Sequence, residues 1–203
     1  MEEIIRKVME HEARSIQNIP VTRSYEKAAG LIYKQVHENN GKLVASGMGK
    51  AGQIAQNIAT TFSSTGTPAV FLHPSDSQHG DLGVVQANDV LLLISNSGKT
   101  REILELVELV ENLRPGLPLI VISGNPDSVL AKNADAFIFT GNPDEVCPLG
   151  LTPTTSTTAM TVIGDALVVA LMTKIKFTST DYAKRHHGGY LGDKSRLQAG
   201  LKK

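Results

Sequence analysis

The segment DVLLLISNSGKTREILELVELVENL, residues 89–113, decides the fold because it joins a strand, a tight turn and a helix. Its first part is apolar at almost every position, which is typical of a strand buried on both faces of a parallel sheet. Its last part, EILELVELVENL, predicts a helix that starts directly after the turn. A buried strand followed at once by a helix is the repeating unit of α/β proteins.

The same unit recurs along the chain. Further strands are expected at 42–46, 68–73, 118–123 and 136–140, with helices at about 51–64, 100–113, 127–133 and 155–173. Residues 2–18 and 23–39 also have helical spacing of apolar side chains. We therefore predict a five-stranded parallel sheet with helices on both faces, a flavodoxin-like or Rossmann-like three-layer α/β sandwich. An N-terminal helical segment, 1–40, would pack on the main domain, 41–193, and a polar tail, 194–203, would follow.

Composition excludes several classes of protein. The 203 residues carry no net charge, 41% are hydrophobic and 4% are aromatic, so nucleic-acid binding has little support. A single cysteine, Cys147, excludes an internal disulfide framework and a Cys-rich zinc site. The N-terminus has no apolar signal-peptide core, and no apolar run approaches the ~18 residues that span a membrane. We expect a cytoplasmic protein that binds neither membranes nor nucleic acid.

The turn SNSGKT, residues 95–100, ends like an ATP-binding P-loop, but it fails that test. A P-loop has a glycine five positions before the glycine of its GKT, and here that position is Leu93, inside the strand. The turn instead offers the hydroxyls of Ser95, Ser97 and Thr100, with Gly98 allowing the chain to turn and helix amides following it. One phosphate group fits such a cradle; a plain N-capped turn is the alternative.

A second glycine-rich turn follows the first predicted strand. GMGKAG, residues 47–52, matches the G-x-G-x-x-G of dinucleotide-binding proteins. That fingerprint also needs an acidic residue at the end of the second strand, where this chain has Phe71-Leu72-His73. What remains is either a second anion site that carries Lys50 or a glycine turn made for close packing.

Five motifs together point to one family. They are SGMGKAG (46–52), HGDLG (79–83), SNSGKT (95–100), CPLGLTPTTSTTA (147–159) and HHGGYLG (186–192). With them the chain resembles the sugar isomerase (SIS) family over about residues 40–192. Within that family it looks most like the arabinose-5-phosphate isomerases, and the CPLGLTPTTSTTA block is the most specific part of the resemblance. In this subgroup a pair of CBS domains usually follows the SIS domain, and we expect this protein to act without them.

The resemblance implies an aldose–ketose isomerase that interconverts ribulose 5-phosphate and arabinose 5-phosphate through an enediol. Such an enzyme supplies the bacterial sugar Kdo for lipopolysaccharide or capsule. The reaction needs a phosphate anchor, a base near neutral pKa and a group that polarises the carbonyl. It needs no cofactor, and we expect no metal. Without CBS domains, any effector acts on the SIS domain itself, and a nucleotide-sugar end product is the ligand to test.

The resemblance also assigns residues to the phosphate and the sugar. The anchor residues are Ser95, Asn96, Ser97, Gly98 and Thr100, with Ser46, Gly47 and His79 nearby and with Thr154, Thr155, Ser156 and Thr157 at the start of the long helix. For the four residues at the start of the long helix, Thr154 to Thr157, the alternative is an ordinary cluster of N-capping residues.

For the chemistry, the matching positions are Lys50, Glu102, Glu145 and His186. Lys50 would stabilise the enediolate or hold the sugar, and a solvated lysine is its alternative. Glu102 falls in the first turn of a helix, where the helix dipole favours a carboxylate, so helix capping is its alternative. Glu145 or His186 would transfer the proton, and the sequence does not choose between them. His186 has a near-neutral reference pKa, and in the family it is thought to reach a neighbouring subunit's site.

The resemblance therefore implies a homotetramer, or at least a dimer, with sites shared between subunits. His79 also falls at an expected subunit boundary, and surface or interface packing is the alternative for both histidines. The chain departs from the family in two places. Lys99 stands where NSGE is usual, and Arg185-His186-His187 replaces the usual Ser-His-Pro. Both changes add positive charge and leave the choice of sugar open.

Two other functions remain open from the sequence. One is an isomerase of a different sugar phosphate, such as a hexulose 6-phosphate or sedoheptulose 7-phosphate. The other is a non-catalytic sugar-phosphate sensor of the kind found in transcriptional regulators. Residues 1–40 are too short and too poor in clustered Lys and Arg for a DNA-binding helix-turn-helix. A pure sensor would need only the phosphate-binding loops, so the presence of Lys50, Glu102, Glu145 and His186 together favours catalysis.

Overall fold

A computed structural model describes residues 1–201 and contains one sheet of five parallel strands in the order β2-β1-β3-β4-β5. The strands are β1 Leu43–Gly47, β2 Ala69–Phe71, β3 Val90–Ile94, β4 Leu119–Ser123 and β5 Ala136–Phe139. β1 lies between β2 and β3, so the chain changes direction across the sheet at the β1–β3 pair. Open α/β sheets bind ligands beyond the carboxyl ends of the strands at such a switch point.

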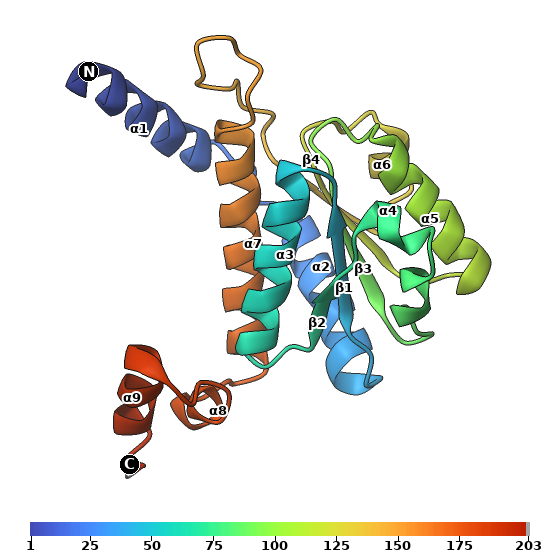
Figure 1. The fold of residues 1–203 in the computed structure, drawn as a ribbon, viewed down its shortest axis with the longest axis vertical. Coiled ribbons are helices and arrows are strands. Elements are labelled where there is room, and N and C mark those ends of the chain that lie inside the picture. The colour runs from blue at the N-terminus through green and yellow to red at the C-terminus, as the bar shows by residue number, and fades with distance from the viewer. Residues whose placement is uncertain (202–203) are drawn as a thin grey trace.

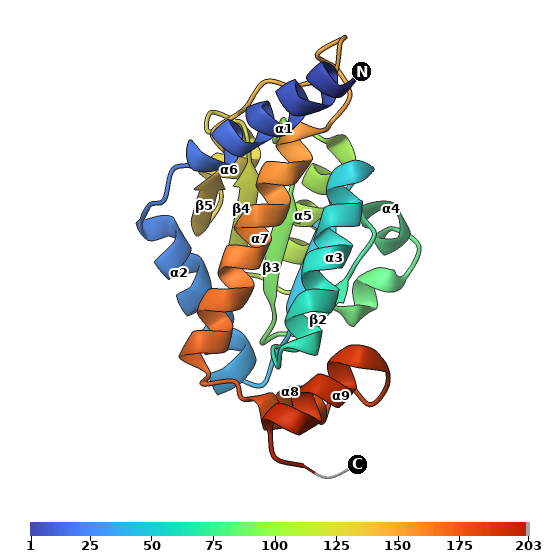
Figure 2. The same ribbon diagram turned by 90° about the vertical axis from the view of Figure 1, so that its left-hand side faces the viewer.

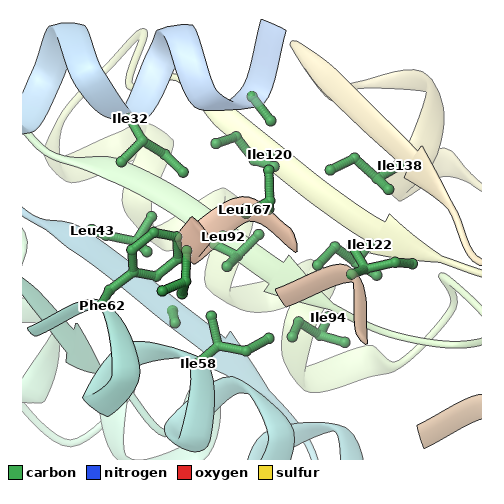
Figure 3. Close-up of a cluster of buried hydrophobic side chains, with 14 of the residues drawn as sticks. Ile32, Leu43, Ile58, Phe62, Leu92, Ile94, Ile120, Ile122, Ile138 and Leu167 are labelled. Atoms are coloured by element: carbon green, nitrogen blue, oxygen red, sulfur yellow. The ribbon is translucent and has the colours of Figure 1, made fainter. Parts of the chain in front are cut away.

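Helices cover both faces of the sheet (Figures 1 and 2). Their bounds are α1 Glu2–Gln17, α2 Arg23–Ile32, α3 Lys50–Ser64, α4 Pro74–Ser77, α5 Arg101–Leu113, α6 Val129–Lys132, α7 Thr155–Lys174, α8 Ser179–Ala183 and α9 Gly189–Gln198. α2, α3 and α7 pack on one face in a single apolar cluster, which includes Phe62, Leu92 and Leu167 (Figure 3). α5 and α6 cover the other face. The predicted three-layer fold is confirmed.

α7 is the most apolar of the long helices and is half-buried in the fold. Its length and composition would also suit a membrane span, but half of that window is buried inside the protein. It packs against α1, α2 and α3. Its apolar character therefore follows from its place in the core. Because it has 20 residues, it is about 30 Å long, and it joins the carboxyl-end side of the sheet to the opposite end of the molecule.

Several boundaries differ from the expected ones. The helix expected over 23–39 is α-helical only to Ile32 and continues as a π-helix, Tyr33–Glu38, in which the Tyr33 and His37 rings stack at 5.6 Å. The wider π turn brings His37 Nε2 within 3.1 Å of Thr67 Oγ1. β2 is three residues long because it is an edge strand and Pro74 begins α4.

Four short elements were not expected from the sequence: α4, the 3-10 helix Asp81–Val84, α8 and α9. α8 and α9 lie beyond the end of α7, at the opposite end of the molecule from α1 (Figure 2). α9 runs through the boundary expected at residue 194, and the division into three segments stays a prediction. Residues 202 and 203, the end of the expected tail, lie outside the described residues.

Candidate functional site

A pocket of about 720 Å³ opens at the carboxyl ends of β1, β3, β4 and β5, where α7 begins. Its lining comes from the turns after these strands and from the first turns of α7: Met48, Lys50, Ala51, Ile94, Ser95, Asn96, Ser97, Thr100, Gly124, Asn125, Pro126, Asp127, Asn142, Pro153, Ser156, Thr157 and Met160. The size is typical of a small-molecule site. Among these residues Lys50 is the cation and Asp127 the carboxylate.

The β3–α5 turn forms the floor of the pocket. Thr100 occupies the N-cap position of α5, but its side chain makes no capping bond and lies instead 2.9 Å from the Ser95 hydroxyl. Ser95 Oγ also accepts a bond from the Gly98 amide, at 3.2 Å, and Ser97 Oγ accepts one from the Lys99 amide, at 3.1 Å. The turn thus gathers three hydroxyls at the N-terminus of α5, where the helix dipole favours an anion.

The β4–α6 turn holds the β3–α5 turn in place. Ser123 Oγ and the Gly124 amide both donate to the Asn96 carbonyl, at 3.1 and 3.0 Å. Asn125 Nδ2 donates to the Ser97 carbonyl at 2.9 Å. These bonds use the carbonyls of the β3–α5 turn and so direct them away from a bound anion.

Gly98 allows the β3–α5 turn to pack this closely. Its φ of +62° is in the left-handed region, and a Cβ there would collide with the Ser128 side chain. Only glycine meets both conditions without strain.

Gly47 and Gly52 bring α3 against the end of β1. A Cβ on Gly47 would lie 2.8 Å from the Ala51 backbone, and one on Gly52 would lie 2.5 Å from the Gly47 carbonyl oxygen. The glycine-rich turn is therefore built for close packing of helix on strand. This packing places Lys50, the first residue of α3, at the pocket. Ser46 directly precedes Gly47, and its Oγ atom is fully buried and makes no hydrogen bond within the described residues.

Glu145 lies beside the pocket and caps α7. Its Oε2 accepts bonds from the Thr154 amide at 2.7 Å, from Thr154 Oγ1 at 3.0 Å and from the Ser156 amide at 3.4 Å. Burial raises the pKa of Glu145, but the hydrogen bonds from Ser156 and Thr154 outweigh it and hold that pKa below its ordinary value. The carboxylate is therefore ionised at neutral pH and already occupied by donors.

The other residues at the start of α7 divide between structure and pocket. Thr155 is buried, and its Oγ1 accepts the Val146 amide at 3.2 Å. Ser156 and Thr157 line the pocket.

In the loop before α7, Cys147 Sγ accepts hydrogen bonds from the Thr152 and Leu151 amides at 3.1 and 3.3 Å. These bonds, that of Thr152 first, lower the pKa of the thiol to about 7.

Besides Ser46, Gly47, Gly98, Glu145, Thr154 and Thr155, three more of the expected residues are absent from the lining of this pocket. Glu102 is half-buried in the first turn of α5. His79 is exposed between α4 and the 3-10 helix. His186 lies between α8 and α9, beyond the far end of α7, where its ring stacks on Tyr182 at 3.7 Å and its Nδ1 lies 3.1 Å from the Tyr182 carbonyl oxygen. The length of α7, about 30 Å, separates His186 from the pocket of its own chain.

The wall that is formed after β4 and β5 was not predicted from the sequence. Gly124, Asn125, Asp127 and Asn142 all line the pocket. A signal was present, because SGNPD, residues 123–127, places polar residues at the end of a buried strand, as SNSG does after β3. Within residues 1–201 no three His, Cys, Asp or Glu side chains lie close enough together to hold a metal ion.

Comparison with known proteins assigns the family. Residues 37–170 match the SIS domain family. The chain belongs to this family. As a SIS domain it is 51% identical over 159 residues to the arabinose 5-phosphate isomerase KdsD of Yersinia pestis, covering 78% of this chain and 48% of that protein. The chain thus spans about half the length of the curated relatives that it matches.

Among the solved structures that resemble this chain, two are informative. A Bacteroides fragilis protein, described as a putative phosphosugar isomerase involved in capsule formation, has 65% identity and a TM-score of 0.92. The alignment covers 94% of this chain and 99% of that one. Protein c3406 of Escherichia coli CFT073, solved in complex with arabinose 5-phosphate, has 38% identity and a TM-score of 0.80, and the alignment covers 91% and 96% of the two chains.

Proposed function

We propose that this SIS domain is an arabinose-5-phosphate isomerase, an aldose–ketose isomerase that interconverts D-ribulose 5-phosphate and D-arabinose 5-phosphate and feeds Kdo synthesis in the cytoplasm. The observation that carries the proposal is the pocket, in which three hydroxyls at a helix N-terminus face the same space as Lys50. The resemblance to KdsD proteins and to the structure solved with arabinose 5-phosphate supports the choice of sugar.

In this proposal the β3–α5 turn holds the phosphate. Ser95, Ser97 and Thr100 donate hydroxyl bonds to it, and the α5 dipole adds to the attraction. Ser156 and Thr157 face the phosphate from the start of α7. Lys50 lies on the β1 side of the turn, where its charge stabilises the enediolate oxygen that forms in the transition state.

The proton transfer fits His186 of a neighbouring subunit better than Glu145. A general base works best with a pKa near the working pH, whereas hydrogen bonds lower the pKa of Glu145 and use its carboxylate as a cap. We therefore assign Glu145 to positioning α7. The base removes the proton from C2 of arabinose 5-phosphate and returns it to C1, while the carbonyl oxygen gains a proton and the C2 hydroxyl loses one.

This assignment requires an assembly, and we propose a homotetramer with sites shared between chains. α1 has no buried residue, and its Ile4, Ile5 and Met9 side chains are largely exposed. α9 likewise exposes Tyr190 and Leu197. These apolar surfaces at both ends of the molecule suit contacts between copies. A nucleotide-sugar end product remains the effector to test against the assembled protein.

Proton NMR in D2O tests the activity. Purified protein incubated with ribulose 5-phosphate should yield arabinose 5-phosphate with deuterium at C2. The shared site is tested separately by complementation. Lys50→Ala and His186→Ala should each be inactive, and co-expressed chains should recover part of the activity because some sites then combine an intact pocket with an intact histidine. No conversion would contradict the proposed activity, and no recovery in hybrids would contradict the shared site.

A further inference from the structure

The side of the pocket opposite Lys50 carries two side-chain amides that the protein itself does not use. Asn96 follows β3 and Asn142 follows β5, and both line the pocket. Their Oδ1 atoms lie 2.7 and 3.0 Å from the position that a Cβ on Gly124 would take. The two amides therefore converge on one small space beside the Gly124 backbone, which any larger residue at that position would fill.

Asn125 shows what a structural asparagine looks like in the same pocket. Its Nδ2 donates to the Ser97 carbonyl at 2.9 Å and its Oδ1 accepts the Asp127 amide at 3.1 Å. The side chains of Asn96 and Asn142 make no such bonds to any part of the chain that the structure describes, residues 1–201. Their amide groups are free to bond a ligand.

Asn142 is also held in an unusual backbone conformation. Its φ is +49°, and Asn40 and Lys176 are the other non-glycine residues with positive φ in the described part of the chain. Strained backbone of this kind is concentrated at ligand sites. Asparagine tolerates it better than most residues, so the conformation presents an amide to the pocket at low cost.

The charged residues of the pocket limit which chemical groups can bind on the side that carries Asn96 and Asn142. Lys50 stands on the β1 side of the β3–α5 turn, and Asp127 lines the wall after β4. A carboxylate repels a phosphate but accepts a hydrogen bond from a hydroxyl, and an amide both donates and accepts. The wall of Asn96, Asn142 and Asp127 therefore suits neutral hydroxyl groups rather than a second anion.

We propose that Asn96 and Asn142 bind hydroxyl groups of the sugar chain between its phosphate and its carbonyl, and that Asn142 is a specificity-determining residue of this site. The inference rests on the proposed function, because it requires a phosphate on the β3–α5 turn. It makes the pocket selective for polyhydroxylated phosphate esters over other small phosphates.

Binding of two unreactive probes separates this role from the phosphate anchor. Inorganic phosphate contacts only the turn, whereas arabinitol 5-phosphate also presents the hydroxyls. Asn142→Gly keeps the positive φ and removes the amide. Asn40→Gly is the matched control, because Asn40 has a φ of +58° and is an exposed residue before β1, at the amino end of the sheet.

In calorimetric titrations Asn142→Gly should weaken arabinitol 5-phosphate about tenfold, since one or two hydrogen bonds are lost. Its affinity for inorganic phosphate should change less than about twofold, and Asn40→Gly should match wild type with both probes. Equal weakening of both probes, or no weakening of either, would overturn the role of Asn142. If wild type binds neither probe, the phosphate anchor and with it the proposed function fail.

Discussion

Replacing Glu145 by glutamine separates a capping role from a catalytic one. The carboxylate accepts two hydrogen bonds from Thr154, the N-cap residue of α7, at 2.7 and 3.0 Å, and one from the Ser156 amide at 3.4 Å. Glutamine preserves the size of the side chain and one acceptor oxygen but removes the negative charge. The helix N-terminus then loses its favourable charge, and hydrogen bonds to an ionised group become weaker neutral ones.

The expected loss is about 1 to 2 kcal/mol, from a charge–dipole term of up to ~2 kcal/mol together with weaker capping bonds. For a chain of this size that lowers the Tm by roughly 2–8 °C. The pKa of Glu145 is lowered in the folded state. The ionised Glu145 therefore stabilises the folded protein fully at a pH above the ordinary pKa of glutamate. This stabilisation is lost as the pH falls through the lowered pKa of the folded state, so the stabilities of wild type and variant should converge in acid.

Two measurements decide between the roles of Glu145. Thermal unfolding followed by circular dichroism at neutral and acidic pH gives the stability difference. Initial rates with ribulose 5-phosphate give kcat, which should fall less than about tenfold because a positioning residue is altered and not the base. A fall of a hundredfold or more with an unchanged Tm would refute the capping argument and make Glu145 the proton-transferring group.

Three further perturbations probe the turn, the sheet and the cysteine loop. Gly98→Ala forces a side chain into left-handed backbone and against Ser128, so affinity for inorganic phosphate in calorimetry should fall about tenfold, for a strain of ~1–2 kcal/mol. Asp89→Asn breaks a buried ion pair with Lys42 at 2.7 Å and should reduce stability in urea titrations by about 3 kcal/mol; an unchanged midpoint would contradict this. Alkylation of Cys147 by iodoacetamide should reach half its maximal rate near pH 7, because the thiol pKa is lowered to about 7, and a midpoint above pH 8 would contradict the bonding seen in the loop.

The sequence was sufficient for the centre of the sheet because β1, β3 and β4 are buried on both faces. β3 and β4 are fully buried along their length, and their continuous apolar character stands out from the helices around them. β2 was predicted too long, as 68–73. It is an edge strand that pairs only with β1, and this pairing covers only Ala69–Phe71. The π turn at Tyr33 is accompanied by a tertiary contact between His37 and Thr67, which no local pattern encodes. α8 did carry a local signal, because Thr178 and Asp181 form a capping box at its start.

The candidate site was predictable where one short segment contains both the residue that allows the turn and the side chains that would bind the ligand. The β3–α5 turn carries its own hydroxyls and its own glycine, so SNSGKT could be interpreted from local chemistry. The role of Asn142 could not be predicted, because its amide meets Gly124 only once β4 and β5 pair in the assembled sheet. The role of Glu145 was likewise hidden, since its partners Thr154 and Ser156 follow it by 9 and 11 residues.

Binding and chemistry should be separable in this protein because different parts of the fold supply them. The turns after β1, β3, β4 and β5 and the start of α7 form the whole pocket within one chain, whereas His186 lies beyond the other end of α7. We therefore expect His186→Ala to bind arabinitol 5-phosphate about as tightly as wild type while its kcat falls by at least about a hundredfold, the usual loss for a general base. Calorimetry and initial rates on the same preparation check both values, with size-exclusion chromatography as the control for assembly. A variant that loses affinity and rate together while keeping its assembly would place the histidine in substrate binding and contradict this separation.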